Sequence, residues 1–286
     1  MAAPADAAVL VGLGSELDLP VVEQAAQEAA DHGRPLHLLH TFDWSAAFAA
    51  DTVAAPRDQA EKLITRAAQL AHQTEPGLTV RGEIVESSVL PTLIRRSEGT
   101  FLLAVGDSGM AGSGQCVPAE TTAVQLAARA GCPLLVVRRE PAPQGPVLVG
   151  VDGSPSSHLA LRWALECANR RNARLLALRV VEYDEDTDAV TEQLTEALAR
   201  HTGRENTVPT ECRVVRGDPA EVLIDTSRNA QVALVAARGD EPGRAMLGAV
   251  AQSLLYHSPA PVVVVRGLAE APLTGPDTRP APNQRP

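Results

Sequence analysis

The chain has 286 residues, is 45% hydrophobic but only 2% aromatic, and carries a formal net charge of −10. Its length predicts two domains, since an average domain has about 150 residues. A core poor in aromatic residues must be built from Ala, Val and Leu, which suits the buried parallel strands of α/β proteins. No cluster of Lys or Arg interrupts the acidity, so we expect no nucleic-acid partner, because binding the phosphate backbone needs a basic surface.

Membrane, secreted and zinc-binding proteins are excluded on similar grounds. No apolar stretch reaches the roughly 18 residues that a membrane span needs, and the first six residues lack the basic start of a secretion signal. The four cysteines have no CxxC spacing and no histidine placed for zinc; they are Cys116, Cys132, Cys167 and Cys212. We therefore expect a cytoplasmic protein with reduced cysteines and no metal site.

Apolar runs and helical spacing predict alternating strands and helices in the first half of the chain. The expected strands are Val9 to Leu13, Leu36 to His40, Thr79 to Val85, Phe101 to Gly106 and Leu134 to Arg138. The expected helices are Pro20 to Asp31, Arg57 to Gln73, Val89 to Arg96 and Thr121 to Ala130. A linker of sequence Glu-Pro-Ala-Pro-Gln-Gly follows at 140–145.

The second half repeats the same order of elements. Its expected strands are Val147 to Val151, Leu175 to Val181, Cys212 to Val215, Val232 to Ala237 and Val262 to Arg266. Its expected helices begin at Ser154-Pro155, cover Asp188 to His201, run from Asp218-Pro219 to Arg228, and cover Leu247 to Tyr256. Residues 268–286 are rich in proline and poor in apolar residues, which predicts disorder.

This alternation predicts right-handed crossovers and a parallel, doubly wound sheet in each half. Each copy is domain-sized, because solenoid repeats are only about 20 to 50 residues long. The predicted fold class is therefore α/β, with two tandem Rossmann-like domains at 1–139 and 146–267.

The most promising binding position lies in the second half. Ligands of open parallel sheets bind at the carboxyl ends of strands, where the strand order reverses. Two loops should meet there: one begins at Asp152-Gly153-Ser154 after the first strand, and the other at Arg238 after the fourth. The second loop is rich in glycine and leads into a helix, whose N–H groups can bind phosphate. An ordinary loop made of turn residues is the alternative.

The second half, from Pro146 to Arg266, resembles a universal stress protein domain. The matching segments are Gly150-Val-Asp-Gly-Ser154, Val180-Val181, Arg238-Gly239, Gly248 and Pro261-Val-Val-Val-Val265. The first half resembles the family more weakly, through Val9-Leu-Val-Gly12, Gly106-Asp-Ser-Gly109 and Pro133-Leu-Leu-Val-Val137. No single motif is very specific, but their recurrence in the same order in both halves is.

The resemblance implies small domains of the adenine-nucleotide alpha hydrolase type that dimerise through the last strand. We therefore expect the last strands of the two halves, Leu134 to Val137 and Val262 to Val265, to face each other within one chain. Such an intramolecular pseudo-dimer leaves further homodimerisation open. It also protects two apolar edge strands, which would otherwise expose unpaired backbone groups.

The function implied is that of a non-enzymatic stress-response module binding one adenine nucleotide, ATP with Mg²⁺, in the second half. The residues expected to bind it are Asp152, Gly153, Ser154, Val181, Arg238, Gly239, Gly243, Arg244 and Gly248. Asp152 and Val181 would hold the base and ribose, and the loop would hold the phosphates. A nucleotide-free interaction scaffold is the alternative, and a weak ATPase is a third hypothesis.

Both halves depart from the nucleotide-binding pattern of the family, Gly-x-x-Gly, nine residues, then Gly-Ser or Gly-Thr. In the second half Ala236 replaces the first glycine, eight residues separate Gly239 from Gly248, and Ala249 replaces the hydroxyl residue. In the first half Ala119-Glu120 stands where Gly-Ser is expected, and Gly14 stands where the second half has Asp152. The first half should therefore not bind ATP, and the second should bind it weakly.

Three other matches carry less weight. The run Gly109-Met-Ala-Gly-Ser-Gly-Gln-Cys116 has the glycine spacing of a P-loop, but it lacks the Lys and Ser/Thr that contact phosphate and magnesium. The segment Gly106-Asp-Ser-Gly109 is similar to a serine protease nucleophile segment, which requires a β-barrel and an upstream His-Asp pair. His158 and His257 lie near predicted helix ends, where a solvated or capping histidine is expected.

Overall fold

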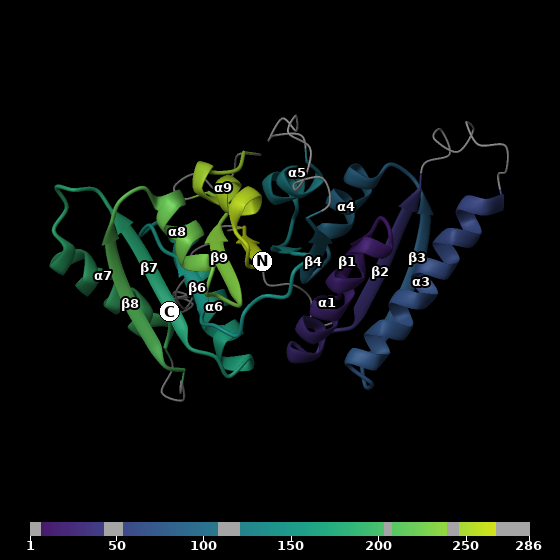
Figure 1. The fold of residues 1–286 in the computed structure, drawn as a ribbon, viewed down its shortest axis with the longest axis horizontal. Helices are drawn as coiled ribbons and strands as arrows, with labels where there is room; N and C mark the ends of the chain where they lie inside the picture. Colours follow the sequence, from purple (N-terminus) through teal and green to yellow (C-terminus); the bar gives the residue numbers. More distant parts are fainter. Residues whose placement is uncertain (1–6, 43–53, 108–120, 203–207, 239–245, 267–286) are drawn as a thin grey trace, which may run out of the picture.

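Ten strands in the described part of the chain form one continuous sheet. The computed structural model describes residues 7–42, 54–107, 121–202, 208–238 and 246–266, with side chains omitted at 54–56. The strand order is β3-β2-β1-β4-β5-β10-β9-β6-β7-β8, so that the two halves of the chain lie side by side (Figure 1). The predicted disorder at 268–286 and the P-loop-like run lie outside the described residues.

In the first half, the strands are β1 (Val9–Leu13), β2 (Leu36–Phe42), β3 (Val80–Glu86), β4 (Leu102–Gly106) and β5 (Leu134–Val137). The helices are the short 3-10 helix η1 (Glu16–Asp18), α1 (Leu19–Asp31), α3 (Ala54–Thr74), α4 (Val89–Ser97) and α5 (Thr122–Arg129). Each expected element is present, with ends displaced by a few residues. The 3-10 helix was not predicted.

In the second half, the strands are β6 (Val147–Gly150), β7 (Leu175–Val181), β8 (Thr210–Arg216), β9 (Val232–Ala236) and β10 (Val262–Val265). The helices are α6 (Pro155–Arg170), α7 (Thr187–His201), α8 (Pro219–Ser227) and α9 (Ala249–His257). The predicted start of α6 is confirmed, since the Ser154 hydroxyl accepts a hydrogen bond from Ser157 N at 3.2 Å and Pro155 is the first helical residue.

Two separate apolar cores lie on the two faces of the sheet. One contains α1, α3, α6 and α7, and the other contains α4, α5, α8 and α9. Residues of β10 alternate between them: Val263 and Val265 belong to the first core, and Val262 and Val264 to the second. Both faces of the sheet are therefore buried, which explains why the strands are continuous runs of Val and Leu. The predicted α/β fold class is confirmed.

The two halves meet through their last strands. β5 and β10 pair antiparallel, with Val263 opposite Leu135, whereas the other paired strands are parallel. Each strand therefore covers the other's backbone edge, and the prediction that the last strands face each other within one chain is confirmed. Beside this pair, Phe101 of the first half and Trp163 of α6 stack with their ring centroids 5.2 Å apart.

Polar side chains also cross the junction between the halves. Arg138, which follows β5, is buried and donates hydrogen bonds to backbone carbonyl groups at the end of α9. Arg171, at the end of α6, forms an ion pair with Glu28 of α1, and both side chains are largely buried. The Thr121 hydroxyl lies 3.3 Å from the Tyr256 hydroxyl of α9. The junction thus combines a shared sheet with specific polar contacts on both faces.

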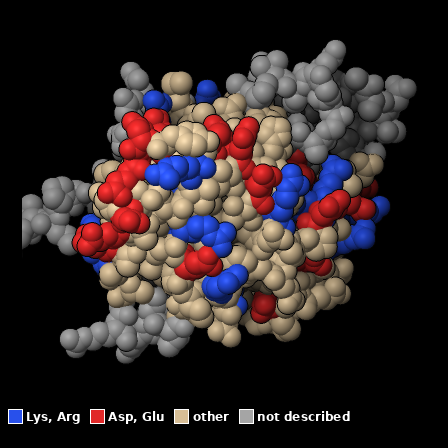
Figure 2. Space-filling view, turned by 60° about the vertical axis from the view of Figure 1, so that its left-hand side comes forward, with Lys and Arg blue, Asp and Glu red and all other residues tan. Residues whose placement is uncertain are grey.

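The outer surface is mixed in charge. On the face in Figure 2, acidic and basic side chains are interspersed. Among the helices that the structure describes, none combines the length and the apolar character of a membrane span.

Candidate functional site

A cavity of about 290 Å³ lies at the carboxyl ends of β6 and β9. These strands are neighbours, yet their following helices cover opposite faces of the sheet, so this is the point where strand order reverses. Its floor and walls are apolar on one side, with Leu178, Val180, Leu223 and Val235 among the lining residues. Asp152, Arg238 and the first residues of α9 also line the cavity. The cavity therefore combines an apolar slot with a polar rim, as small-ligand sites commonly do.

Asp152 is held at the rim by its own loop. Its carboxylate accepts a hydrogen bond from Ser154 N at 2.9 Å. Partial burial raises the pKa of the Asp152 carboxyl, but hydrogen bonds from Ser154 and Ser157 lower it, and the resulting pKa lies below its ordinary value. Asp152 is therefore a fixed anion at neutral pH, suited to accept hydrogen bonds from hydroxyl or amino groups of a ligand.

The first turn of α9 supplies the other polar groups. Gly248 is the N-cap residue of α9, and no side chain caps this helix. The N–H of Gly248 itself donates to Ala237 O at 2.8 Å. The next two residues, Ala249 and Val250, line the cavity, and N–H groups in the first turn of a helix have no partner within the helix. This end of α9 therefore offers a partial positive charge to the cavity.

Apart from Val181, the expected binding residues fall into three groups. Asp152, Arg238 and Gly248 line this cavity. Gly153 and Ser154 line a neighbouring cavity instead, and the Ser154 hydroxyl is used as the helix cap of α6. Gly239, Gly243 and Arg244 lie outside the described residues, so their role stays a prediction.

Val181, expected to hold the base or ribose, is not among the residues that line this cavity, so its role stays a prediction. The Val181 side chain is only 2% exposed and lies in the core, whereas Val180 lines the cavity. Successive side chains of a strand point to opposite faces of the sheet, so only one of the two valines can face the cavity. A pair of adjacent valines in the sequence does not reveal which one it is.

The corresponding loop of the first half is closed by its own side chain. The Asp18 carboxylate accepts hydrogen bonds from Gly14 N at 2.8 Å and from Ser15 N at 2.9 Å, and Asp18 is only 5% exposed. The helix equivalent to α9 is also capped, because the Thr121 hydroxyl accepts a hydrogen bond from Val124 N. In the first half a side chain thus caps the helix that corresponds to α9, whereas no side chain caps α9 itself.

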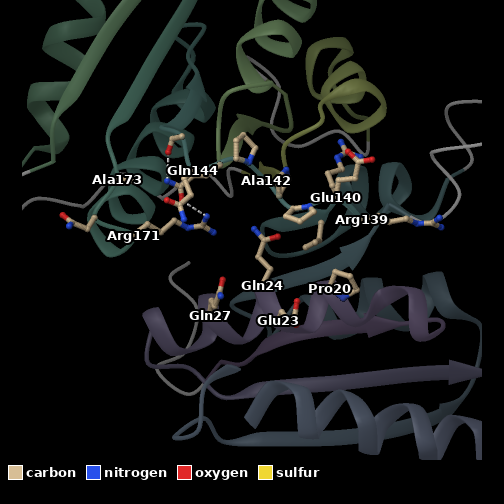
Figure 3. A pocket seen from close by; sticks show the side chains of 18 residues that line it. Pro20, Glu23, Gln24, Gln27, Arg139, Glu140, Ala142, Gln144, Arg171 and Ala173 are labelled. Carbon is tan, nitrogen blue, oxygen red and sulfur yellow. Dashed lines mark hydrogen bonds between the residues drawn. The ribbon is translucent and has the colours of Figure 1, made fainter. Parts of the chain in front are cut away.

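A larger cavity, of about 730 Å³, lies at the junction between the halves (Figure 3). Its lining combines α1, the linker and the turn between α6 and β7. Two hydrogen bonds join polar groups of this lining: Arg171 donates to Gln231 Oε1 at 3.1 Å, and Gln231 Nε2 donates to Gly145 O at 2.7 Å. These groups hold the linker in place, and the smaller cavity offers more available chemistry.

Within the described part of the chain, no group of three or more His, Cys, Asp or Glu residues is arranged to hold a metal ion. His257, expected to be solvated, is the exposed last residue of α9. His158 is half-buried, lines the neighbouring cavity, and its ring centroid lies 6.2 Å from that of His201.

Both halves of the chain are similar in sequence to known proteins. A family model described as the universal stress protein family matches residues 7–138 and 145–266. A universal stress protein of Mycolicibacterium smegmatis is 30% identical over 284 residues, which cover 90% of this chain and 96% of that protein. One from Mycobacterium tuberculosis is 32% identical over 287 residues, with the same shares covered.

Among solved structures, a universal stress protein from Archaeoglobus fulgidus has a TM-score of 0.72 at 18% identity. The match covers 92% of this chain and 97% of the Archaeoglobus chain. At this identity the similarity concerns the fold, and it extends over both halves.

Proposed function

The chain belongs to the universal stress protein family, and from this premise we propose that it binds one adenine nucleotide, ATP, in its second half. The protein then acts as a cytoplasmic regulatory module whose state depends on the nucleotide, without turning it over. The observation that carries the proposal is the difference between the two halves. No side chain caps α9, whereas in the first half Thr121 caps the corresponding helix and the Asp18 carboxylate binds the N–H groups of Gly14 and Ser15.

The lining of the cavity fits the parts of a nucleotide. The apolar side formed by Leu178, Val180 and Leu223 suits a flat base, and Asp152 at the rim suits the hydroxyl groups of a ribose. The phosphates then lie against the first turn of α9 and Arg238, where the helix dipole favours negative charge. A Mg²⁺ ion would be held mainly by the phosphate oxygens, since the described residues offer no cluster of metal ligands.

Two substitutions predict that the binding is weak. Ala249 lines the cavity at the position where the family pattern has a hydroxyl residue, so one hydrogen bond to the phosphates is lost. A hydrogen bond to a charged group contributes about 1.5–3 kcal/mol, which corresponds to a loss of about 10- to 150-fold in affinity. Ala236 adds a methyl group where the pattern has glycine. We therefore expect a Kd in the micromolar range or weaker.

Calorimetric titration of the full chain with ATP and Mg²⁺ tests the proposal, with two variants of one residue. Ala249→Ser should tighten binding by about tenfold or more, because it restores a hydroxyl donor. Ala249→Asp should abolish binding, because it places a carboxylate against the phosphates. Both variants add a small polar group at an exposed position, so differences in folding do not explain opposite effects.

The alternative, a nucleotide-free interaction scaffold, is favoured by the same two alanines. It would be supported if millimolar ATP gave no heat and no rise in melting temperature in either the natural protein or Ala249→Ser, since a ligand that binds the native state must stabilise it. The third hypothesis, a weak ATPase, predicts release of phosphate over hours. Binding of two nucleotides per chain would contradict the proposed difference between the halves.

A further inference from the structure

A second cavity, of about 480 Å³, lies on the opposite side of the Asp152 loop from the candidate nucleotide site. It is enclosed by the loop after β6, by the end of β7 and by helices α6 and α7, which cover one face of the sheet. The nucleotide cavity opens instead beside α8 and α9. The two cavities share only Val151 and Asp152 among their lining residues. They are therefore neighbours that use different side chains.

Two arginines and a histidine from three elements line this second cavity: Arg179 of β7, Arg200 of α7 and His158 of α6. Among the described residues, the Arg179 side chain has no hydrogen bond or ion pair. Arg200 forms an ion pair with Glu196, with Nη2 of Arg200 3.8 Å from Oε2 of Glu196, and both of these side chains are more than half exposed. An exposed pair of this kind contributes about 0–1 kcal/mol, so Arg200 can exchange Glu196 for another anion.

The negative charge nearby does not balance these groups. Asp152 is the carboxylate among the lining residues, and its hydrogen bonds are made with its own loop. The pKa of His201, beside the cavity, is lowered by partial burial and by the positive charges of His158, Arg162 and Arg200. The space between α6 and α7 thus has an excess of positive charge.

The loop after β6 leaves space for the Arg179 side chain at Gly153. Gly153 has a φ of +83°, and an added Cβ would lie 2.6 Å from Nη1 of Arg179. Any other residue there would be strained and would push the guanidinium away. The first half lacks this arrangement, because its equivalent strand position is His40, whose ring nitrogen bonds to Leu13 O at 2.8 Å.

We propose that this cavity binds the phosphate group of a small phosphorylated molecule, separately from the nucleotide. Arg179 and Arg200 bind the phosphate oxygens, and His158 donates a third hydrogen bond from the side of α6. A planar guanidinium matches two phosphate oxygens at once, which favours phosphate over halide ions. The volume lies within the range of about 300–1,000 Å³ typical of small-molecule sites, and Gln193 is available for the rest of the ligand.

The test is calorimetric titration of the full chain with inorganic phosphate and with glycerol 3-phosphate, in a chloride buffer of constant ionic strength. We expect saturable binding of one phosphate group per chain, with the tighter affinity for the probe that also fills the organic part of the cavity. Arg179→Gln should weaken binding at least tenfold. Arg200→Gln, at an exposed position that leaves the fold intact, should weaken it severalfold. Arg213→Gln is the matched control, since Arg213 is an exposed residue of β8 that pairs with Glu211.

The Ala249→Asp variant separates this proposal from the nucleotide site, because Ala249 lines only the other cavity. Phosphate binding retained in Ala249→Asp but reduced in both Arg179→Gln and Arg200→Gln would support the second site, whether or not ATP binds. Phosphate binding lost in Ala249→Asp would assign the anion to the nucleotide cavity. The proposal would be overturned by loss of phosphate binding in Ala249→Asp, by equal phosphate binding in all variants, or by the absence of saturable binding at millimolar phosphate.

Discussion

Replacing Arg138 by methionine should weaken the junction between the two halves. The guanidinium extends from β5 of the first half to the end of α9 in the second. There Nη2 donates to Leu254 O at 3.0 Å and Leu255 O at 2.8 Å, and Nε donates to Ala260 O at 3.3 Å. The last carbonyl groups of a helix have no partner within the helix, so Arg138 satisfies them from across the junction.

The expected loss of stability depends on which hydrogen bonds each of the three carbonyl groups keeps without Arg138. Leu254 O and Ala260 O also accept hydrogen bonds from Ser258, so they lose only part of their bonding. Leu255 O loses its bond to Arg138, and a buried acceptor without a partner costs about 1–3 kcal/mol. Together with the two weakened carbonyls, and offset by removal of a buried charge, we expect a loss of about 3 kcal/mol in the free energy of unfolding.

Urea denaturation followed by circular dichroism measures this loss. With a slope of about 3 kcal/mol per molar urea, the midpoint should fall by about 1 M. Arg139→Met is the matched control, because Arg139 is exposed and lies 3.9 Å from Asp107, so its midpoint should change by about 0.2 M or less. If the two variants unfolded at the same urea concentration, Arg138 would not stabilise the junction and the reasoning would be refuted.

Three further predictions concern single positions. Asp152→Asn should lower the free energy of unfolding at neutral pH, because the pKa of Asp152 is depressed in the folded state. This difference in stability from the natural protein should fade as the pH drops below the ordinary pKa of 3.8. A difference in urea midpoints that does not change with pH would contradict this prediction. Cys132 and Cys167, whose pKa values burial raises to about 12, should resist iodoacetamide at pH 8 until urea is added, as mass spectrometry can show. Gly145→Ala should lower the melting temperature, because the added Cβ would collide with the backbone before β9, whereas Gly77→Ala, which meets nothing within 4 Å, should not.

The architecture could be predicted from the sequence because its signals are local. Continuous runs such as Val262 to Val265 indicate buried parallel strands, and the Ser154-Pro155 pair marks the start of a helix within one residue. The pairing of the two last strands was expected from the resemblance to the family and from the cost of exposed apolar edges, whereas its antiparallel direction is a finding of the structure. Errors at the ends of elements were a few residues, as for β8, which extends beyond the predicted Cys212 to Val215 on both sides.

The sites were less predictable because their residues come together from distant parts of the chain. The position of Val180 in the cavity depends on the face to which each strand residue points, which the sequence Val-Val does not reveal. Arg179 and Arg200 lie on different elements, and no spacing rule relates them. In the first half, the buried Asp18 could have been suspected, because Ser15 followed by an acidic residue three positions later is the pattern of a capping box.

Helix α9 gives the first half a role in the site of the second. Its N-terminal turn lines the candidate nucleotide cavity, while residues of the first half contact its other end. The Thr121 hydroxyl, which caps α5, lies 3.3 Å from Tyr256, and Arg138 holds the last carbonyl groups. A helix of nine residues is a rigid body, so movement of its first turn toward a ligand must be accommodated at these contacts. A first half with an occupied loop therefore still shapes the second half's site, by fixing the helix on which that site depends.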